Sequence, residues 1–391
     1  MAGDAGWPLS REWLVALGRR DLRALWLLLL TLGVSSYLLV DSPRLMRSWG
    51  LFPRAARILF SAGPAGNFHL YHVRPDYQFG PVATLVAAPF APVPLHASKL
   101  LAAVLLTVTG LLLVAVVVAL ESGVVTAPRR GPLLLGGAVV MPVWVDLSIA
   151  AGHLDDVLAL GFGVFGVIFV QRAQPVWAAV MFALAVDSKP WALGFVIAVL
   201  ALPRSWWVRS LSVFSAVVAA AWLPFFLIEP QTLDALRFRL ALTNGSLLRL
   251  VQPSGGLIPM WVRPTQLLIA LVVGWFLVRA GAVQAVLLVT IAARILLDPE
   301  IAAYYTSGAA LAALLADGLT GRRVPWFALS VAGLLWLPQS FFPNGSTWNA
   351  VAMALRLLWT LGTLIALLHL ARMMRARRSV FVSVRPIDST A

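Results

Sequence analysis

Carboxylates at the edges of long apolar runs are the residues of this sequence best suited to proton-transfer chemistry. Asp41 ends the first apolar run, directly before Ser42-Pro43. A carboxylate held at a membrane–water boundary can take a proton as a general base. The same Asp-Ser-Pro sequence is a good start for a following helix, so a helix cap is the alternative role. Asp76, in a polar stretch that runs from residue 74 to residue 78, is the rival candidate for the base.

One imidazole and two carboxylates lie together in the segment Gly152-His153-Leu154-Asp155-Asp156. Such a group can bind sugar hydroxyls, a divalent cation or an anionic head group. Alternatively, the two acids cap the helix that follows and complement its dipole. One histidine with two adjacent acids is a loose metal-ligand set, so we predict no cofactor and leave a divalent cation as an alternative.

Two cations lie at breaks in apolar stretches, where they suit a phosphate. Lys189 precedes Pro190 and could hold a phosphate as a point charge, or pair locally with Asp187. Arg294 precedes Asp298 by one helical turn, and Tyr304 follows shortly after. That pattern predicts either a second phosphate clamp with aromatic walls or an ordinary i,i+4 ion pair.

The elements that must position these residues are apolar helices. Of 391 residues, 60% are hydrophobic and 12% are charged, against the ~25% charged residues usual in soluble domains. This composition excludes a soluble globular protein. The apolar stretches are continuous and do not alternate, so they predict an all-α membrane bundle rather than a β-barrel.

Two kinds of chemistry are excluded by missing residue types and motifs. The sequence has no cysteine, which rules out disulfides, thiol nucleophiles and cysteine-bound iron–sulfur sites. It also has no Walker or Rossmann fingerprint, so a nucleotide-using enzyme is not expected. The net charge of +14 suits an anionic inner leaflet better than nucleic acid, because the arginines lie in short turns.

The apolar runs predict about twelve membrane spans. They cover residues 22–40, 97–121, 131–150, 155–171, 175–188, 190–203, 207–228, 264–279, 281–297, 301–317, 325–342 and 348–371. Alternate turns carry arginine, and the others carry most of the acids. By the positive-inside rule this pattern places the chain in the cell membrane, with both termini in the cytoplasm and the acidic turns outside.

This topology divides the chain into a cytoplasmic segment 1–21, a transmembrane domain 22–372 and a cytoplasmic tail 373–391. Two long loops, the first long loop at 41–96 and the second long loop at 229–263, are expected outside. The first begins with an amphipathic stretch that should lie in the interface plane, broken by Gly50 and Pro53. One face carries Arg44, Arg47, Arg54 and Arg57, and the other carries Leu45, Trp49, Phe52, Leu59 and Phe60.

In their order along residues 20–372, these motifs resemble the GT-C superfamily of membrane glycosyltransferases. Within it the sequence is most similar to glycosyltransferase family 87, the actinobacterial polyprenol-phosphate-mannose-dependent mannosyltransferases. The motifs are Asp41, Tyr77-Gln78-Phe79-Gly80-Pro81, Gly152-His153-Leu154-Asp155-Asp156, Ser188-Lys189-Pro190-Trp191, and Asp298-Pro299 followed by Tyr304-Tyr305. The resemblance implies a GT-C-like helical bundle that works on the outer side with a lipid-phosphate sugar as donor.

By position, Asp41 matches the active-site acid of that family, with Asp76 in the same loop as the alternative. We therefore predict transfer of a sugar, expected to be mannose, from a polyprenyl-phosphate donor to a hydroxyl of a cell-envelope glycan or glycolipid. The predicted roles are Lys189, His153 and Arg294 at the donor phosphate, and Asp155, Asp156 and Tyr304 at the acceptor or sugar. The alternative function is a secondary transporter or a lipid-carrier flippase.

Overall fold

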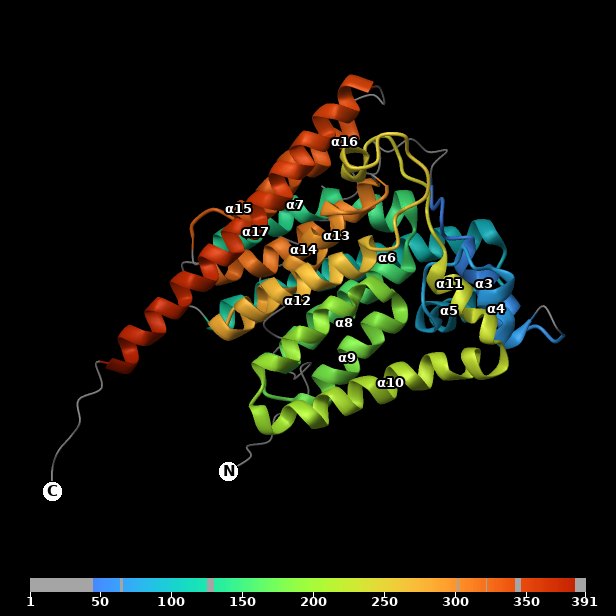
Figure 1. Cartoon of the computed structure of the whole chain (residues 1–391), viewed down its shortest axis with the longest axis horizontal. Coiled ribbons are helices and arrows are strands. Elements are labelled where there is room, and N and C mark those ends of the chain that lie inside the picture. Colours follow the sequence, from blue (N-terminus) through green and yellow to red (C-terminus); the bar gives the residue numbers. More distant parts are fainter. Residues whose placement is uncertain are drawn as a thin grey trace.

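A computed structural model describes residues 45–63, 66–124, 130–300, 302–320, 322–341 and 346–383 (Figure 1). Over these ranges the chain is helical, and its β-structure is limited to one isolated bridge between Ala241 and Leu257. The expected first span, 22–40, and the candidate base Asp41 lie outside the described residues.

Long helices make up the body of the molecule. They are α6 (Leu95–Val124), α7 (Arg130–Val145), α8 (Leu154–Gln171), α9 (Pro175–Ser188), η6 (Pro190–Ala201), α10 (Trp207–Ile228), α12 (Val262–Ala280), α13 (Val286–Leu296), α14 (Ala303–Thr320) and α17 (Ser346–Ser383). The shorter elements that matter for the site are α3 (Leu51–Leu59), α4 (Leu70–Val73), α5 (Pro81–Ala87), η3 (Ala88–Phe90), η5 (Asp146–Ala151), α11 (Leu233–Arg237), α15 (Trp326–Val331), η11 (Ala332–Trp336) and α16 (Leu337–Phe341).

The long apolar runs fold as helices, as expected from residue 97 onward. Among the described residues, six helices are long and apolar enough to cross a membrane. They cover Leu95–Ala119, Gly131–Ala151, Leu154–Gln171, Arg204–Ile228, Val262–Ala280 and Thr347–Ala376. Other apolar helices, such as Pro175–Ser188 and Pro190–Ala201, are shorter. The protein is therefore a helical protein suited to a membrane, and the count of twelve spans stays a prediction.

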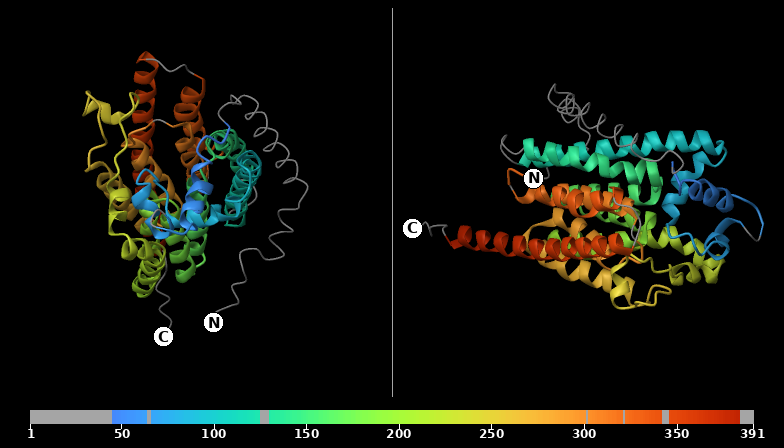
Figure 2. Two further views of the ribbon diagram at one scale, coloured as in Figure 1. Left: turned by 90° about the vertical axis from the view of Figure 1, so that its right-hand side faces the viewer. Right: turned by 90° about the horizontal axis from the view of Figure 1, so that it is seen from above.

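The short helices of the two long loops gather at one end of the bundle. In Figure 1 the helices α3, α4, α5 and α11 lie together beside the right-hand end of α10, and Figure 2 shows the same end from above. Helix α11 packs on α4, and α5 packs on α9. The two loops thus share one end of the molecule, where α8 begins and α9 ends.

The amphipathic stretch differs from its prediction in two ways. Residues 45–50 form a turn and α3 begins at Leu51, so the helix is interrupted at Gly50 as predicted. Pro53 does not break it, because it falls in the first turn, where a missing N–H needs no partner. Its apolar face packs on protein: Trp49 and Phe52 are each 1% exposed, whereas Phe60 is 64% exposed. The arginines at 54 and 57 are exposed. The helix therefore presents its basic face outward and its apolar face to the bundle.

Helix α17 is longer than the expected span. It runs from Ser346 to Ser383 and so passes through the first half of the predicted tail. Arginine, which recurs between residues 372 and 378, is a good helix former and does not end the helix. The far end of α17 consequently projects beyond the other helices (Figure 2).

The core lies around α14, whose residues from Ala309 to Ala316 are all at most 1% exposed. Five of these eight positions are alanine and three are leucine. Small side chains let helices approach closely in an apolar environment. This packing holds α14 against α7 and α13, and α13 carries Arg294 to the site described next.

Candidate functional site

The first corner of the site is the start of α8. The π-helical turn η5 ends at Gly152, whose φ of 66° is left-handed, a conformation that glycine adopts without steric cost. Asp155 and Asp156 follow in the first turn of α8 and are only 1% and 4% exposed. Acids there complement the helix dipole, but His153, the residue before the helix, makes no side-chain cap.

The second corner is the break between α9 and η6, where Lys189 is extended and Pro190 begins the next helix. The Lys189 ammonium bonds Asp155 and lies 3.7 Å from Oδ2 of Asp156. The alternative prediction of a local pair with Asp187 was therefore wrong. Burial lowers the pKa of Lys189, but the two carboxylates outweigh it and hold that pKa above its usual value. Lys189 is a buried cation at neutral pH.

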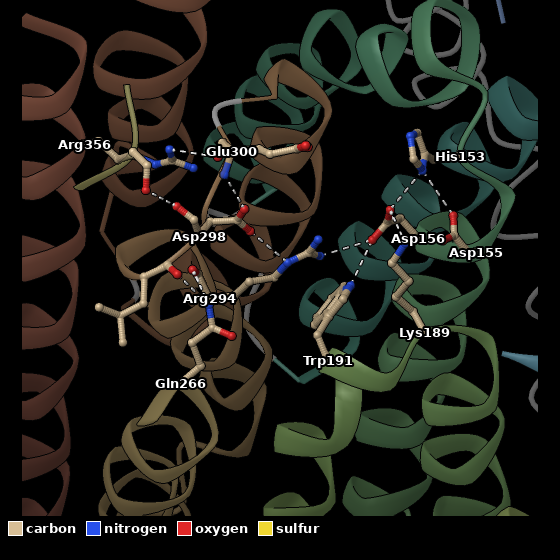
Figure 3. Close-up of polar contacts among 12 residues, drawn as sticks. His153, Asp155, Asp156, Lys189, Trp191, Gln266, Arg294, Asp298, Glu300 and Arg356 are labelled. Carbon is tan, nitrogen blue, oxygen red and sulfur yellow. Dashed lines mark hydrogen bonds and ion pairs between the residues drawn. The ribbon is translucent and has the colours of Figure 1, made fainter. Parts of the chain in front are cut away.

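The third corner is the end of α13, where Arg294 contacts two acids. Its Nη1 lies 3.3 Å from Oδ1 of Asp156, and its Nε lies 3.3 Å from Oδ2 of Asp298. The predicted i,i+4 pair is thus present, and the same guanidinium also reaches α8 (Figure 3). Trp191 adds its indole N–H to Asp156 at 3.0 Å. We call His153, Asp155, Asp156, Lys189 and Arg294 the charged cluster.

Aromatic rings line the charged cluster. The Arg294 guanidinium lies 4.2 Å from the ring centre of Tyr305 and 4.8 Å from that of Trp191. The rings of His153 and Tyr304 stack with centres 4.0 Å apart. A small pocket opens beside these rings, with an apolar wall on one side. Its lining consists of Asp156, Leu160, Trp191, Ile291, Arg294, Ile295, Tyr304, Tyr305 and Gly308.

A second polar group extends the network toward α17. Asp298 accepts the Glu300 backbone N–H at 3.1 Å, and Nη1 of Arg356 donates to the Glu300 carbonyl at 3.2 Å. Arg356 is 2% exposed and is not among the site residues predicted from the sequence. The sequence does contain a signal for Arg356, because it lies inside the apolar run 348–371. A charged side chain within such a run is energetically unfavourable and is usually functional. Burial raises the pKa of Asp298 in spite of Arg294 and Arg356.

The first long loop is attached to two corners of the charged cluster. The N–H groups of Met46, Arg47 and Ser48 donate to the carbonyls of residues 149, 150 and 151, and the Phe52 ring lies 6.5 Å from that of His153. On the other side, Gly80 donates its N–H to the Ser188 carbonyl at 2.9 Å. A Cβ on Gly80 would lie 2.0 Å from the Asp187 carbonyl oxygen, so only glycine fits.

The predicted acids outside the charged cluster have other surroundings. Asp76 accepts two hydrogen bonds from Arg74, at 2.8 and 2.6 Å. These bonds lower its pKa, which makes it a weaker base. Asp146 accepts from the Trp336 indole at 2.6 Å, joining the two π-helical turns η5 and η11. Asp41 lies outside the described residues.

A divalent cation could bind where His153, Asp155 and Asp156 converge, because their ligand atoms lie within 4.8 Å of one another. The Lys189 ammonium already contacts both carboxylates, so a metal ion would compete with it. The arrangement is equally able to exchange carboxylate partners for the oxygens of a phosphate, which charged N–H donors bind well.

Comparisons with known proteins give no match to any family model, any curated protein or any solved structure. The resemblance to the GT-C superfamily therefore stays a prediction based on the order of its motifs.

Proposed function

We propose that this protein is an integral-membrane glycosyltransferase with a GT-C-like fold. It moves a sugar, mannose in our proposal, from a polyprenyl-phosphate donor to a hydroxyl of a cell-envelope glycan or glycolipid. The reaction takes place on the outer face of the cell membrane, where the two long loops lie. It requires no nucleotide, because the donor reaches the site through the bilayer.

The observation that carries the proposal is the burial of two cations, Lys189 and Arg294, at the ends of apolar helices. Their side chains are 11% and 13% exposed. Charged groups at such positions are costly and mark functional sites by default. Arg294 lines a pocket with apolar walls, and Lys189 lies 3.7 Å from Asp156, which lines the same pocket. Such a site suits a ligand with a charged head and an apolar tail. A polyprenyl phosphate has both.

The donor is already activated, since phosphate is a good leaving group. The acceptor oxygen attacks the anomeric carbon of the sugar as the base takes the hydroxyl proton. The bond between that carbon and the phosphate oxygen breaks, and polyprenyl phosphate leaves with the electron pair. Lys189 and Arg294 neutralise the charge that develops on the phosphate, a stabilisation that is strongest where water is excluded.

Phosphate binding by these cations requires an exchange of partners. Lys189 and Arg294 balance Asp155 and Asp156 in charge, so the donor phosphate must take over contacts that a carboxylate makes. Arg294 uses Nε and Nη1 for its acids, and within the described residues its Nη2 donates no hydrogen bond. Nη2 is thus the donor we assign to the phosphate. The released Asp155 and Asp156, with Tyr304, then hold sugar or acceptor hydroxyls.

Our proposed base is Asp41, with Asp76 second because of its bonds to Arg74. Asp41 precedes Leu45 by four residues, a length that spans at most about 14 Å. Leu45 itself adjoins the segment that donates to the end of η5. A base that enters from this loop approaches the charged cluster from the side of His153, which leaves the side of Arg294 to the phosphate.

Proteoliposomes that contain the purified chain and radiolabelled polyprenyl-phosphate mannose test this function. We expect label to pass to an envelope glycolipid acceptor with the unmodified protein and with Asp76→Asn, and not with Asp41→Asn. Arg294→Lys keeps a cation but loses the paired, stacked geometry of guanidinium, so it should weaken donor binding more than it lowers the maximal rate.

Two outcomes would count against the proposal. Asp41→Asn that elutes as a folded monodisperse protein and still transfers sugar would remove Asp41 as the base. Movement of a solute or of the lipid carrier across the liposome without consumption of the sugar would favour the transporter or flippase instead.

A further inference from the structure

Helix α3 carries a basic surface that the proposed reaction does not use. Arg54 and Arg57 are one helical turn apart and both are exposed, as are Phe60 at 64% and Leu51 at 38%. Arg57 donates one long hydrogen bond, of 3.3 Å, to the Ala91 carbonyl. We call Arg54, Arg57, Leu51 and Phe60 the α3 surface.

No acidic residue close in the sequence neutralises the positive charge of the α3 surface. Residues 45–63, 66–73 and 81–119, which include α3 and the short helices packed against it, contain no acid. Outside these ranges, Asp76 is near enough for Arg54 to contribute to lowering its pKa, but Arg74 already pairs with Asp76. An anionic partner from outside the chain would therefore find two unopposed guanidinium groups.

The depth of α3 is set by its contacts with the start of α6. The Trp49 indole donates to Ser98 at 2.7 Å, and Lys99 donates to the Leu45 carbonyl at 3.1 Å. A Cβ on Gly50 would lie 3.8 Å from the Leu95 side chain, and Leu95 is the first residue of a candidate membrane span. The turn that begins α3 thus lies level with the point where α6 enters the membrane.

We propose that the α3 surface binds the phosphate of an anionic membrane phospholipid. Lipid phosphates lie at the boundary where α6 begins, and arginine pairs with them through two parallel hydrogen bonds. The exposed Phe60 and Leu51 suit the adjoining acyl region, as aromatic and aliphatic side chains do at membrane interfaces. This site is separate from the donor phosphate site at Arg294, and it depends only on the membrane placement of α6.

Titration of the full chain in detergent with phosphatidylglycerol or phosphatidylcholine, followed by native mass spectrometry, tests the proposal. Each basic residue near a membrane surface contributes roughly fivefold in binding. Arg54→Gln with Arg57→Gln should therefore weaken the tightest phosphatidylglycerol binding about 25-fold and leave phosphatidylcholine binding unchanged. Arg54→Lys with Arg57→Lys keeps the charge and should retain most of the binding.

Arg237→Gln with Arg239→Gln is a matched control, because it removes the same charge from exposed positions on the second long loop. We expect it to bind phosphatidylglycerol like the unmodified chain. Unchanged phosphatidylglycerol binding by the double glutamine variant of α3 would overturn the proposal. The proposal would also be wrong if Arg54→Gln with Arg57→Gln kept lipid binding but lost retention on a heparin column. That result would show that the α3 surface binds a soluble polyanion.

Discussion

Two arginine–carboxylate groups of this protein differ both in distance and in surroundings. Arg74 holds Asp76 at 2.6 Å with side chains 26% and 42% exposed. Arg294 holds Asp156 at 3.3 Å with side chains 13% and 6% exposed. The closer pair is the exposed one. A short distance is therefore no guide to which pair takes part in the proposed reaction, and our assignment of Arg294 depends instead on its burial among apolar helices.

The energetic consequences of the two groups differ for the same reason. An exposed pair contributes roughly 0–1 kcal/mol to stability, because water screens it. A buried pair can contribute little net stability, yet removing one partner costs several kcal/mol since the other charge stays buried. Well-packed apolar side chains in place of the charged cluster would often stabilise the fold as well or better. Stability alone therefore does not explain these charges.

The largest expected effect on stability comes from removing a cation from the buried charged cluster. Lys189→Met leaves Asp155, which is 1% exposed, without its cation. We expect a loss of about 3–5 kcal/mol in the free energy of unfolding, measured by reversible titration of mixed micelles with sodium dodecyl sulfate.

The sequence offers a matched control, because Lys99 is the one other lysine. Lys99 donates a single hydrogen bond to a carbonyl, so Lys99→Met should cost only about 0.5–1.5 kcal/mol. Equal losses for the two variants would contradict the distinction between a buried ion pair and a simple hydrogen bond.

The next largest effect on stability is expected where the first long loop is attached beside the charged cluster. Gly80→Ala places a Cβ against the Asp187 carbonyl and should destabilise by about 1–3 kcal/mol. The first long loop should also become more sensitive to trypsin, with cleavage after Arg54 or Arg57. Gly362→Ala is the control, because a Cβ there meets no atom within 4 Å. Equal trypsin sensitivity in the two variants would mean that Gly80 does not anchor the loop.

The smallest effect belongs to the exposed pair. Asp76→Asn should change the free energy of unfolding by less than about 1 kcal/mol at neutral pH. Hydrogen bonds from Arg74 lower the pKa of Asp76, so the pair stabilises the fold above the usual aspartate pKa near 4. That contribution is lost as the pH falls through the lowered pKa. Thermal midpoints of the unmodified and Asp76→Asn proteins should therefore approach each other as the pH falls below about 4, and a difference that does not shrink there would contradict the assigned role of the pair.

Much of the helical fold and of the candidate site could be predicted from the sequence. The apolar runs from residue 97 onward fold as helices, and the residues His153, Asp155, Asp156, Lys189, Arg294 and Tyr304 lie together. Their predictability has a simple cause: each lies at the end of an apolar run, and helices of similar length bring such ends to the same level.

Pairing between helices could not be predicted in the same way. Lys189 is two residues from Asp187 but bonds Asp155 on another helix, because the extended backbone at Lys189 directs the chain away from α9. Arg356 and Trp336 are likewise joined to partners 56 and 190 residues away. A single sequence contains no information on such distances. The break predicted at Pro53 is wrong because the effect of a proline depends on where the helix begins, and α3 begins only two residues before it.

The proposal depends most on one point of topology: the first long loop and the charged cluster face the outside. The absence of cysteine allows a direct measurement with single-cysteine variants and a membrane-impermeant maleimide on intact cells. Ser61→Cys, on the exposed end of the first long loop, should react without permeabilisation, and Arg323→Cys, in the turn between α14 and α15, should react only after it. The reverse pattern would put the charged cluster at the cytoplasmic face and contradict the proposed reaction.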